Sequence, residues 1–430
     1  MSRLKRAGLI ALVVLVGALA MIGLIAVTRG TPISYVVTLA DSGPPAVDDT
    51  LFERTFEIFT GAHISAGNQV QAVNNGAVYD SLWKDLHAAQ KTITVQMYYS
   101  LPGAVADSMA KILIERAHAK VRVLFLVDAF GSQHLSKAYM KSLTNAGVEV
   151  AKLRRLTWSS IANASTRSHV RVVVIDGHIG YTGGFGIADY WLGDGHRDEQ
   201  WRESNVRFQG PSVMQLQAAF SAAWAESTGE LLTGSLFFPL TGFQSSGGMD
   251  AGLLYTAPTT GSTPAERFLA LTISGARRTL YITNSYFVPD DDFRHLLERA
   301  RRRGVDVRIL TVGAKTDVKT TWYAGRHHYE ELLGHGIRVF EYQPAMLHSK
   351  TIVADGVFSA VGSMNFDNRS MAFNNESQLI VIDSTFGRQM DSTFMDDLRF
   401  SQEIKLDEFQ KRSILSRLIE TVAAFTSRLL

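Results

Sequence analysis

Two stretches of nineteen residues, 179 positions apart, carry one repeated pattern. Residues 168–186 read SHVRVVVIDGHIGYTGGFG, and residues 347–365 read LHSKTIVADGVFSAVGSMN. Both place a histidine second, a cationic residue two positions later, then an apolar run, Asp-Gly and a turn led by glycine. Because self-similarity at a fixed distance indicates a duplicated structural unit, the chain is expected to fold into two similar lobes.

The segments around the two copies predict an α/β fold. Strands rich in β-branched and aromatic residues alternate with segments of helical periodicity, which is typical of a mostly parallel or mixed sheet flanked by helices. In the first half the segments are KTITVQMYY (91–99), MAKILIERAHAK (109–120) and VRVLFLVD (121–128). In the second half they are RTLYITNSYFVPD (278–290), FRHLLERARRRG (293–304) and VDVRILTVG (305–313).

The N-terminus predicts a membrane anchor. Residues 7–27 hold no charged side chain and are long enough, as a helix, to cross about 30 Å of hydrocarbon. Arg3, Lys5 and Arg6 precede this segment, so the positive-inside rule places the short N-terminus in the cytoplasm and the rest of the chain outside it. A cleaved signal peptide is the alternative, because Ala18-Leu19-Ala20 resembles a cleavage site.

These patterns together predict the organisation of the whole chain. In order, the predicted parts are a cytoplasmic N-terminus (1–6), a transmembrane helix (7–27), a tether (28–50), the first lobe (51–232), a connector (233–252), the second lobe (253–408) and an amphipathic C-terminal helix (409–430). The apolar face of the last helix is expected either to pack against the body or to lie on an anionic membrane. It comprises Ile414, Leu418, Val422, Phe425 and Leu429.

Charge and composition exclude some classes of function. Lysine and arginine number 43 against 41 acidic residues, so no overall charge favours a polyanionic partner, and no specific nucleic acid is expected. The run RARRR (299–303) is expected to be a solvated helix end that complements the helix dipole, with a nucleic-acid patch as the alternative. The chain has no cysteine, which excludes disulfides, thiolate catalysis and cysteine-ligated zinc.

The repeated pattern is suited to binding a phosphate group. The histidine and the cationic residue lie two apart on a predicted strand, so both project from one face. Histidine, a cation, serine, asparagine and turn amides supply the charge and the hydrogen bonds that a phosphodiester needs. Two such half-sites also bring two histidines to one phosphorus, where one attacks and the other protonates the leaving oxygen. No metal or cofactor is expected.

On these residues the chain resembles the phospholipase D superfamily, whose motif is His-x-Lys-(x)4-Asp followed by Gly-Ser-x-Asn. The second copy matches throughout, with His348, Lys350, Asp355, Ser363 and Asn365. The resemblance covers about residues 51–410. The segments MLHSK (346–350) and GSMNFDNRS (362–370) are most similar to the bacterial cardiolipin synthase branch.

The first copy departs from the motif at three positions. It keeps His169 and Asp176, but it has Arg171 in place of lysine and Gly184 and Gly186 in place of serine and asparagine. An arginine retains the charge and can bind phosphate with two donors. The glycines are expected to replace the missing side-chain donors with backbone N–H groups.

The resemblance also implies roles for the site residues. His169 would be the nucleophile and His348 the general acid, while Arg171 and Lys350 would stabilise the phosphoryl oxygens. Asp176 and Asp355 belong to the motif, but at strand ends before turns they are equally open to a structural interpretation. In the family each histidine is oriented by a carboxylate about 30 positions downstream, which places Glu203 with His169 and Glu376 with His348.

The predicted function is therefore that of a membrane-anchored phosphatidyltransferase similar to cardiolipin synthases, acting on phospholipids through a phosphohistidine. A phospholipase D hydrolase and an extracytoplasmic nuclease are the enzymatic alternatives, because this superfamily's motifs report the phosphodiester chemistry better than the substrate. A lipid-headgroup binder with a degenerate first motif is the non-catalytic alternative. The expected partners are phospholipid substrate and the membrane.

Overall fold

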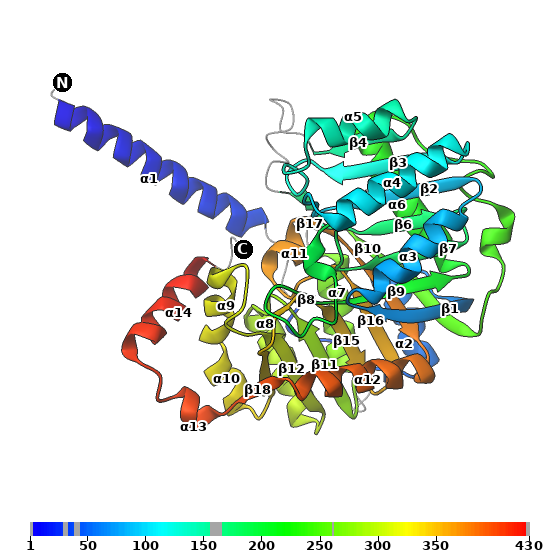
Figure 1. The fold of residues 1–430 in the computed structure, drawn as a ribbon. Helices are drawn as coiled ribbons and strands as arrows, with labels where there is room; N and C mark the ends of the chain where they lie inside the picture. Colours follow the sequence, from blue (N-terminus) through cyan, green and yellow to red (C-terminus); the bar gives the residue numbers. More distant parts are fainter. Residues whose placement is uncertain (1–2, 29–32, 38–43, 155–165, 260–261, 427–430) are drawn as a thin grey trace.

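A computed structural model of the chain describes residues 3–28, 33–37, 44–154, 166–259 and 262–426. Two α/β lobes lie against each other (Figure 1), the first in cyan to green and the second in yellow to orange. The described strands form a 16-stranded sheet that runs through both lobes, and a separate two-stranded sheet. The predicted α/β fold with two similar lobes is confirmed.

The strand order of the first lobe repeats in the second, with the same pattern of parallel and antiparallel neighbours. The first lobe's order is β4 (Glu149–Leu153), β3 (Arg122–Asp128), β2 (Thr92–Met97), β6 (Val172–Ile175), β7 (Ile179–Gly183), β9 (Ser204–Gln209) and β1 (Ser65–Asn74). The second lobe's order is β13 (Arg338–Tyr342), β12 (Asp306–Val312), β11 (Thr279–Asn284), β15 (Lys350–Ala354), β16 (Phe358–Gly362), β17 (Asn374–Ile382) and β10 (Met249–Thr256).

The remaining strand pairs complete the sheet. Strand β18 (Ser401–Ile404) pairs with β13 at one edge, and β1 pairs with β10 to join the lobes. In both lobes the first three strands are parallel and the others antiparallel. The parallel strands β2, β3 and β11 are almost entirely buried, as expected for strands with helices on both faces.

Helices cover both faces of the sheet. In the first lobe, α3 (Ala77–Ala88) and α4 (Ala104–His118) bury one core against β2 and β3, with α5 (Lys137–Asn145) beside α4. In the second lobe, α7 (Pro264–Gly275) and α8 (Asp291–Arg302) bury the corresponding core. A third core contains α6 (Ser212–Thr228) and α12 (Ser384–Leu398) together with strands of both lobes. This shared core fixes the lobes relative to each other.

Two elements differ from the predicted lobe limits. Helix α2 (Thr50–Thr60), placed by the sequence at the start of the first lobe, packs against α7, and its Phe52 and Phe56 lie in the second lobe's core. Strand β10 begins at Met249, inside the predicted connector. The reason is physical: Phe52 and Phe56 face Phe358 and Phe268, so aromatic packing draws α2 across to the second lobe.

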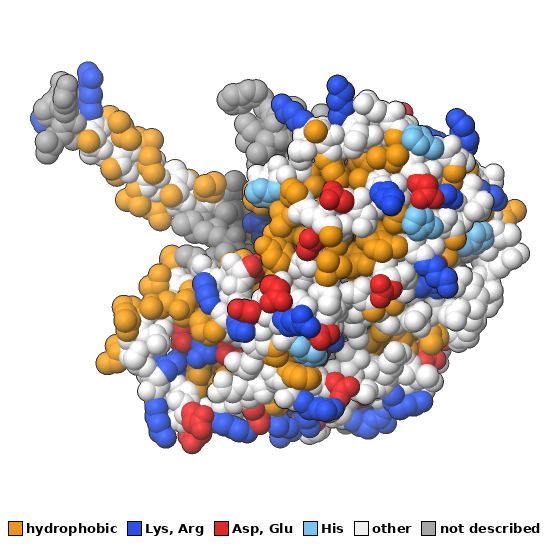
Figure 2. Space-filling view, viewed as in Figure 1, with side chains coloured by type: hydrophobic (Ala, Val, Ile, Leu, Met, Phe, Trp, Pro, Cys, Tyr) orange, Lys and Arg blue, Asp and Glu red, His pale blue; other side chains and the backbone are white. Residues whose placement is uncertain are grey.

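Helix α1 (Arg3–Thr28) projects away from the body (Figure 1), and its described side chains up to Met21 are mostly apolar (Figure 2). Its large apolar side chains between Leu9 and Met21 are all more than half exposed. Within the part of the chain that the structure describes, no helix combines the length and the apolar character that crossing a membrane requires. The transmembrane helix predicted over 7–27 is thus not confirmed. Part of the predicted tether lies outside the described residues.

The predicted C-terminal helix is present as α14 (Ile414–Thr426) and packs on α9 (Lys319–His327). Its buried side is partly charged, because Glu420 forms ion pairs with Arg326 and Arg412. Its large apolar residues face outward instead, among them Ile414 and Phe425, which are 86% and 82% exposed. Leu429 lies outside the described residues. Neighbouring helices α10 (Tyr329–Gly334) and α13 (Leu406–Phe409) complete this end of the molecule.

Candidate active site

Each motif histidine lies beside a strand of the opposite lobe. Two-residue strand β5 (Arg167–Ser168) pairs with β17, and the His169 amide donates to the Asn375 carbonyl at 2.9 Å. Strand β14 (Met346–Leu347) pairs with β8 (Trp201–Arg202), and the His348 amide donates to the Arg202 carbonyl at 2.8 Å. The site is therefore built at the junction of the lobes, and each motif reaches across it.

This exchange determines which carboxylate each histidine meets. His169 Nδ1 lies 2.9 Å from Glu376 Oε2, and His348 Nδ1 lies 2.5 Å from Glu203 Oε2. The prediction that each glutamate orients the histidine of its own lobe was wrong: the pairs are crossed. We call His169 with Glu376 the His169 half-site, and His348 with Glu203 the His348 half-site. With Nδ1–H donated to a carboxylate, each imidazole leaves Nε2 free for chemistry.

The two motif cations occupy equivalent places. An Arg171 guanidinium nitrogen donates to the His169 carbonyl, and Lys350 Nζ donates to the His348 carbonyl. Both side chains are almost fully buried. The charges of Arg171 and Lys350 act on both histidines and both glutamates, which shows that these groups share one electrostatic environment. Such a site is preorganised for an anion.

In the His169 half-site, burial and the charge of Arg171 lower the pKa of His169 to about 4. Burial acts to raise the pKa of Glu376, but its interactions with His169 and its hydrogen bond from Ser363 outweigh burial and leave that pKa below its usual value. At neutral pH this half-site therefore holds a neutral imidazole and an ionised carboxylate. A neutral imidazole is the form that can attack phosphorus.

The His348 half-site has a different proton balance. Burial raises the pKa of Glu203 to about 7, although Lys350 and Arg171 oppose this rise. Burial and the nearby charges of Lys350, Arg171 and His169 lower the pKa of His348 well below its usual value. Burial likewise lowers the pKa of Lys350 to about 7. Near neutral pH this half-site therefore lies close to gaining or losing a proton, as a general acid and base requires.

The second motif's turn supplies side-chain donors to the His169 half-site. Ser363 Oγ donates to Glu376 Oε2 at 2.5 Å, and Asn374 Nδ2 donates to Glu376 Oε1 at 3.2 Å. Asn365, predicted as a substrate-binding residue, is buried nearby. Among the described residues, the Oδ1 atoms of Asn365 and Asn374 have no hydrogen-bond partner although both are buried. Buried acceptors without partners are uncommon, so they indicate a place for a ligand's hydroxyl group.

The glycines of the first motif make room for a tryptophan. A side chain at Gly184 would place Cβ 2.4 Å from Glu203 Oε2, and one at Gly186 would place it 2.8 Å from the Trp191 ring. Trp191, in the short helix η2 (Asp189–Trp191), donates its indole N–H to Glu203 Oε2 at 3.2 Å. The indole thus supplies the donor that serine supplies in the second motif, and it packs edge-on against His348.

The predicted substitution of backbone donors at the first motif's glycines was wrong for Gly184. The Gly184 and Phe185 amides both donate to Asn205 Oδ1 at 3.1 Å, so they are already satisfied within the protein. Gly186 contributes space instead, and its carbonyl accepts from the Tyr79 hydroxyl at 2.7 Å. No motif or spacing in the sequence pointed directly to Trp191 in this place.

The two motif aspartates lie outside the catalytic centre, so their assignment as catalytic residues was wrong. Asp176 accepts the backbone N–H groups of residues 90–92, and Asp355 accepts those of residues 277–279. Both have positive φ, and a glycine follows each in the turn. Each aspartate lies seven positions after its histidine, roughly 20 Å along an extended chain. They hold the start of β2 and β11, the structural role that the sequence left open for them.

Several aromatic residues at the site were missed by the sequence reasoning. The Tyr98 and His169 rings pack edge-on with centroids 5.0 Å apart, and Trp201 packs beside His348 at the same distance. Tyr286 donates to Asp317 across the end of β11. The repeat offered a signal, because Tyr98 and Tyr286 follow corresponding strands β2 and β11, and side chains beyond the ends of such strands commonly line ligand sites.

Comparison with known proteins agrees with this geometry. The family model described as "Cardiolipin synthase, PLD-like domain" matches residues 82–224 and 269–398. A cardiolipin synthase of Geobacillus kaustophilus is 32% identical over 375 residues, covering 86% of this chain and 74% of that protein. Cardiolipin synthase A of Pseudomonas putida is 30% identical over 397 residues, covering 90% and 82% of the respective chains.

A solved structure provides a fold comparison. The crystal structure of phosphatidylserine synthase from Haemophilus influenzae Rd KW20 aligns with a TM-score of 0.64 and 11% identity, over 88% of this chain and 97% of that one. Two repeated lobes that bring two motif histidines to one buried site define a protein of the phospholipase D superfamily. Within that superfamily, the chain belongs to the cardiolipin synthase family.

Proposed function

We propose that this protein is a phosphatidyltransferase that moves a phosphatidyl group from one phospholipid to the hydroxyl of another, with phosphatidylglycerol as donor and acceptor. The crossed histidine–glutamate pairs carry this proposal. They hold two Nε2 atoms free in one buried, cationic site, which is the arrangement that two-step phosphodiester exchange requires. Membership of the cardiolipin synthase family supports the choice of a phospholipid substrate.

In the first step, His169 Nε2 attacks the phosphorus of the donor lipid. The bond from phosphorus to the oxygen of the headgroup glycerol breaks as His348 gives that oxygen a proton. The phosphatidyl group remains on His169. Arg171 and Lys350 stabilise the charge on the phosphoryl oxygens. The arriving phosphodiester carries a negative charge, which raises the pKa of His348 and favours the protonated form that the acid needs.

In the second step, the acceptor hydroxyl gives its proton to the now neutral His348 and attacks the same phosphorus. The phosphorus–nitrogen bond breaks, and His169 Nε2 recovers its lone pair. Glu376 keeps the His169 ring in the tautomer that attacks and then leaves. Water that enters at this stage gives phosphatidic acid instead, so exclusion of water decides between transfer and hydrolysis.

Purified protein in mixed micelles with labelled phosphatidylglycerol tests this function. We expect cardiolipin and glycerol, identified by mass spectrometry, and no product with His169→Asn or His348→Asn. Phosphatidic acid as the only product would identify a hydrolase. If the protein cleaves single-stranded DNA and leaves the lipid intact, it is a nuclease. Lipid binding without turnover would identify the headgroup binder.

Membrane attachment is part of the proposal. The exposed apolar side chains of α1 and the outward apolar face of α14 support it, because contiguous exposed apolar surface marks contact with a membrane or a partner. We propose that α1 anchors the chain with its N-terminus in the cytoplasm, as the basic residues before it favour. The two lobes would then lie outside the cytoplasm.

The absence of native cysteine gives a direct test of this topology. In spheroplasts, a membrane-impermeant maleimide should label Ser142→Cys, which lies on the exposed side of α5. Labelling only after lysis would place the lobes in the cytoplasm. The mass of the purified chain separates a retained anchor from a cleaved signal peptide.

A further inference from the structure

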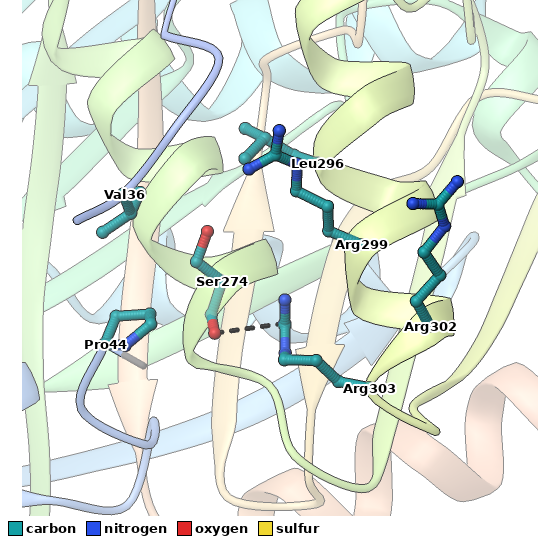
Figure 3. Close-up of a pocket in the computed structure, with 7 residues that line it drawn as sticks. All are labelled: Val36, Pro44, Ser274, Leu296, Arg299, Arg302 and Arg303. Carbon is teal, nitrogen blue, oxygen red and sulfur yellow. Dashed lines mark hydrogen bonds between the residues drawn. The ribbon is translucent and has the colours of Figure 1, made fainter. Parts of the chain in front are cut away.

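A pocket lined by arginines lies at the C-terminal end of α8, where Val36 and Pro44 meet the second lobe (Figure 3). Its volume is about 370 Å³, room for a ligand of several heavy atoms. We call it the arginine pocket. Its lining residues are Val36, Pro44, Ser274, Leu296, Arg299, Arg302 and Arg303. Three of these seven are cations and none is acidic.

Two of the three pocket cations have no carboxylate partner within the described part of the chain. Arg302 is paired with Glu298, but Arg299 has no carboxylate or hydrogen-bond partner among the described residues, and its guanidinium lies 3.7 Å from the centre of the Tyr35 ring. Arg303 donates to the Ile273 and Ser274 carbonyls at 3.1 and 3.2 Å. Burial and the charge of nearby Arg277 lower the pKa of Arg303, a sign of uncompensated positive charge.

The arrangement of the pocket is more specific than a solvated helix end. Arg299 lies in the last turn of α8 and Arg303 directly follows the helix, and both direct their guanidinium groups toward the space beside Ser274 (Figure 3). Complementing the helix dipole explains basic residues in a last turn, but it does not explain why Val36 and Pro44 line the same pocket. Ser34 contacts Asp292, and the Pro44 carbonyl accepts from Arg277.

We propose that the arginine pocket binds a phosphate group, as a second anion site separate from the catalytic centre. Guanidinium groups are the preferred partners of phosphate because their planar donors match its oxygens. Val36, Pro44 and Leu296 add apolar contacts beside the cations. The phosphate can come from an anionic lipid headgroup or from free phosphate, and both share this chemistry. A bound anion would join the segment after α1 to α8.

Hydrogen–deuterium exchange on the full chain in detergent micelles tests the site locally. The probes are inorganic phosphate and, separately, dihexanoyl phosphatidylglycerol. With one or both, we expect exchange to slow about tenfold in peptides that cover residues 33–37 and 293–303, as a ligand near ten times its Kd produces. Peptides that contain His169 and His348 report the catalytic centre independently, so the result does not depend on turnover.

Matched variants complete the test. In Arg299→Gln/Arg302→Gln the protection should disappear, whereas Arg301→Gln should keep it, because Arg301 lies on the same turn but donates to the Gly336 and Val305 carbonyls outside the pocket. Protection by inorganic phosphate identifies a general phosphate site, and protection by the lipid alone identifies a headgroup site. Absence of protection with both probes, or equal protection in the double variant, would overturn the proposal.

Discussion

The two half-sites have the same backbone frame but different donors around their carboxylates. Glu376 receives two side-chain hydrogen bonds, from Ser363 and Asn374, besides that of His169. Glu203 receives the Trp191 indole and the Ser204 amide. One carboxylate consequently stays ionised, while burial raises the pKa of the other to about 7. The two half-sites thus share a geometry but differ in the ionisation of their carboxylates.

This difference supports unequal roles for the histidines. An ionised Glu376 keeps a neutral His169 oriented for attack, which suits a nucleophile. A Glu203 that titrates near neutral pH can share a proton with His348, which suits an acid that later acts as a base.

Loss of either histidine should abolish turnover, but only one loss should prevent the covalent intermediate. We expect His169→Asn and His348→Asn to lower cardiolipin formation by at least about 10³-fold, because each removes a group that acts in both steps. With a donor lipid that carries a p-nitrophenyl leaving group, His348→Asn should still accumulate phosphatidyl-enzyme, since this leaving group needs no acid.

Peptide mass spectrometry after rapid quenching locates that intermediate. The modification should map to His169 and be absent from His169→Asn. Modification of His348 would reverse the assignment of the nucleophile. Thermal unfolding of both variants controls for loss of the fold, because both histidines are buried.

Substituting the two glutamates should also lower kcat unequally, with the larger loss at Glu376. Glu376→Gln removes the charge that holds His169, and we expect kcat to fall about 10³-fold, somewhat less than loss of a triad aspartate costs elsewhere. Glu203→Gln resembles the protonated form that Glu203 already populates near pH 7, so a loss of about tenfold is expected. Steady-state rates at pH 7 measure both.

Exposed Glu199 offers a control, since Glu199→Gln should have no effect. Equal losses in the two buried variants would show that the half-sites do not divide the proton roles. A larger loss in Glu203→Gln would reverse the division.

The crossed pairing marks the limit of what the sequence could predict. The duplicated lobes, the α/β class, His169, His348 and the two cations follow from periodicity and from the motif itself. The glutamates were found, but spacing within a repeat assigned each to its own lobe. Only the pairing of two-residue strands β5 and β14 with the opposite lobe reverses that assignment. Contacts between such short strands leave no periodic signal in a sequence.

The altered glycines show the same limit for a different reason. Their departure from the motif was visible, but what compensates for it depends on Trp191, which comes from a separate short helix. Asp176 and Asp355 were ambiguous for a related reason. An aspartate in a motif can be conserved for catalysis or for a turn, and only the three backbone N–H groups around each carboxylate decide the matter.

Restoring the motif serine in the first copy should damage the enzyme. The Cβ of Gly184→Ser would lie 2.4 Å from Glu203 Oε2, so the variant should lose about 1–3 kcal/mol of unfolding free energy and about tenfold in kcat. Chemical denaturation and steady-state assays measure these losses. Ser363→Gly, the reverse change, should lower stability without a clash, because it removes the hydroxyl that donates to Glu376 and accepts from the Ser377 amide. Improved activity in Gly184→Ser would refute the explanation based on Trp191.

The smallest expected effect is that of Arg171→Lys, which restores the motif cation. A lysine keeps the charge beside His169 but loses the bond from Arg171 Nε to the Phe185 carbonyl, so we expect kcat within about threefold of the wild-type value. The positive charge at position 171 also contributes to the acid limb of the pH profile, which is the fall of kcat/KM at low pH. The pKa of His169 is lowered to about 4, so the nucleophile is neutral above that pH, and its protonation should remove activity as the pH drops through about 4.

Arg171→Gln separates charge from hydrogen bonding in this comparison. Without the positive charge, the protonated form of His169 becomes less unfavourable, so its pKa rises and the acid limb moves to higher pH. Arg171→Lys should leave the limb where it is, because lysine retains the charge. If neither variant moves the limb, the limb belongs to another group. If both move it equally, the geometry of the guanidinium rather than its charge sets the ionisation of His169, and the two motif cations are not equivalent.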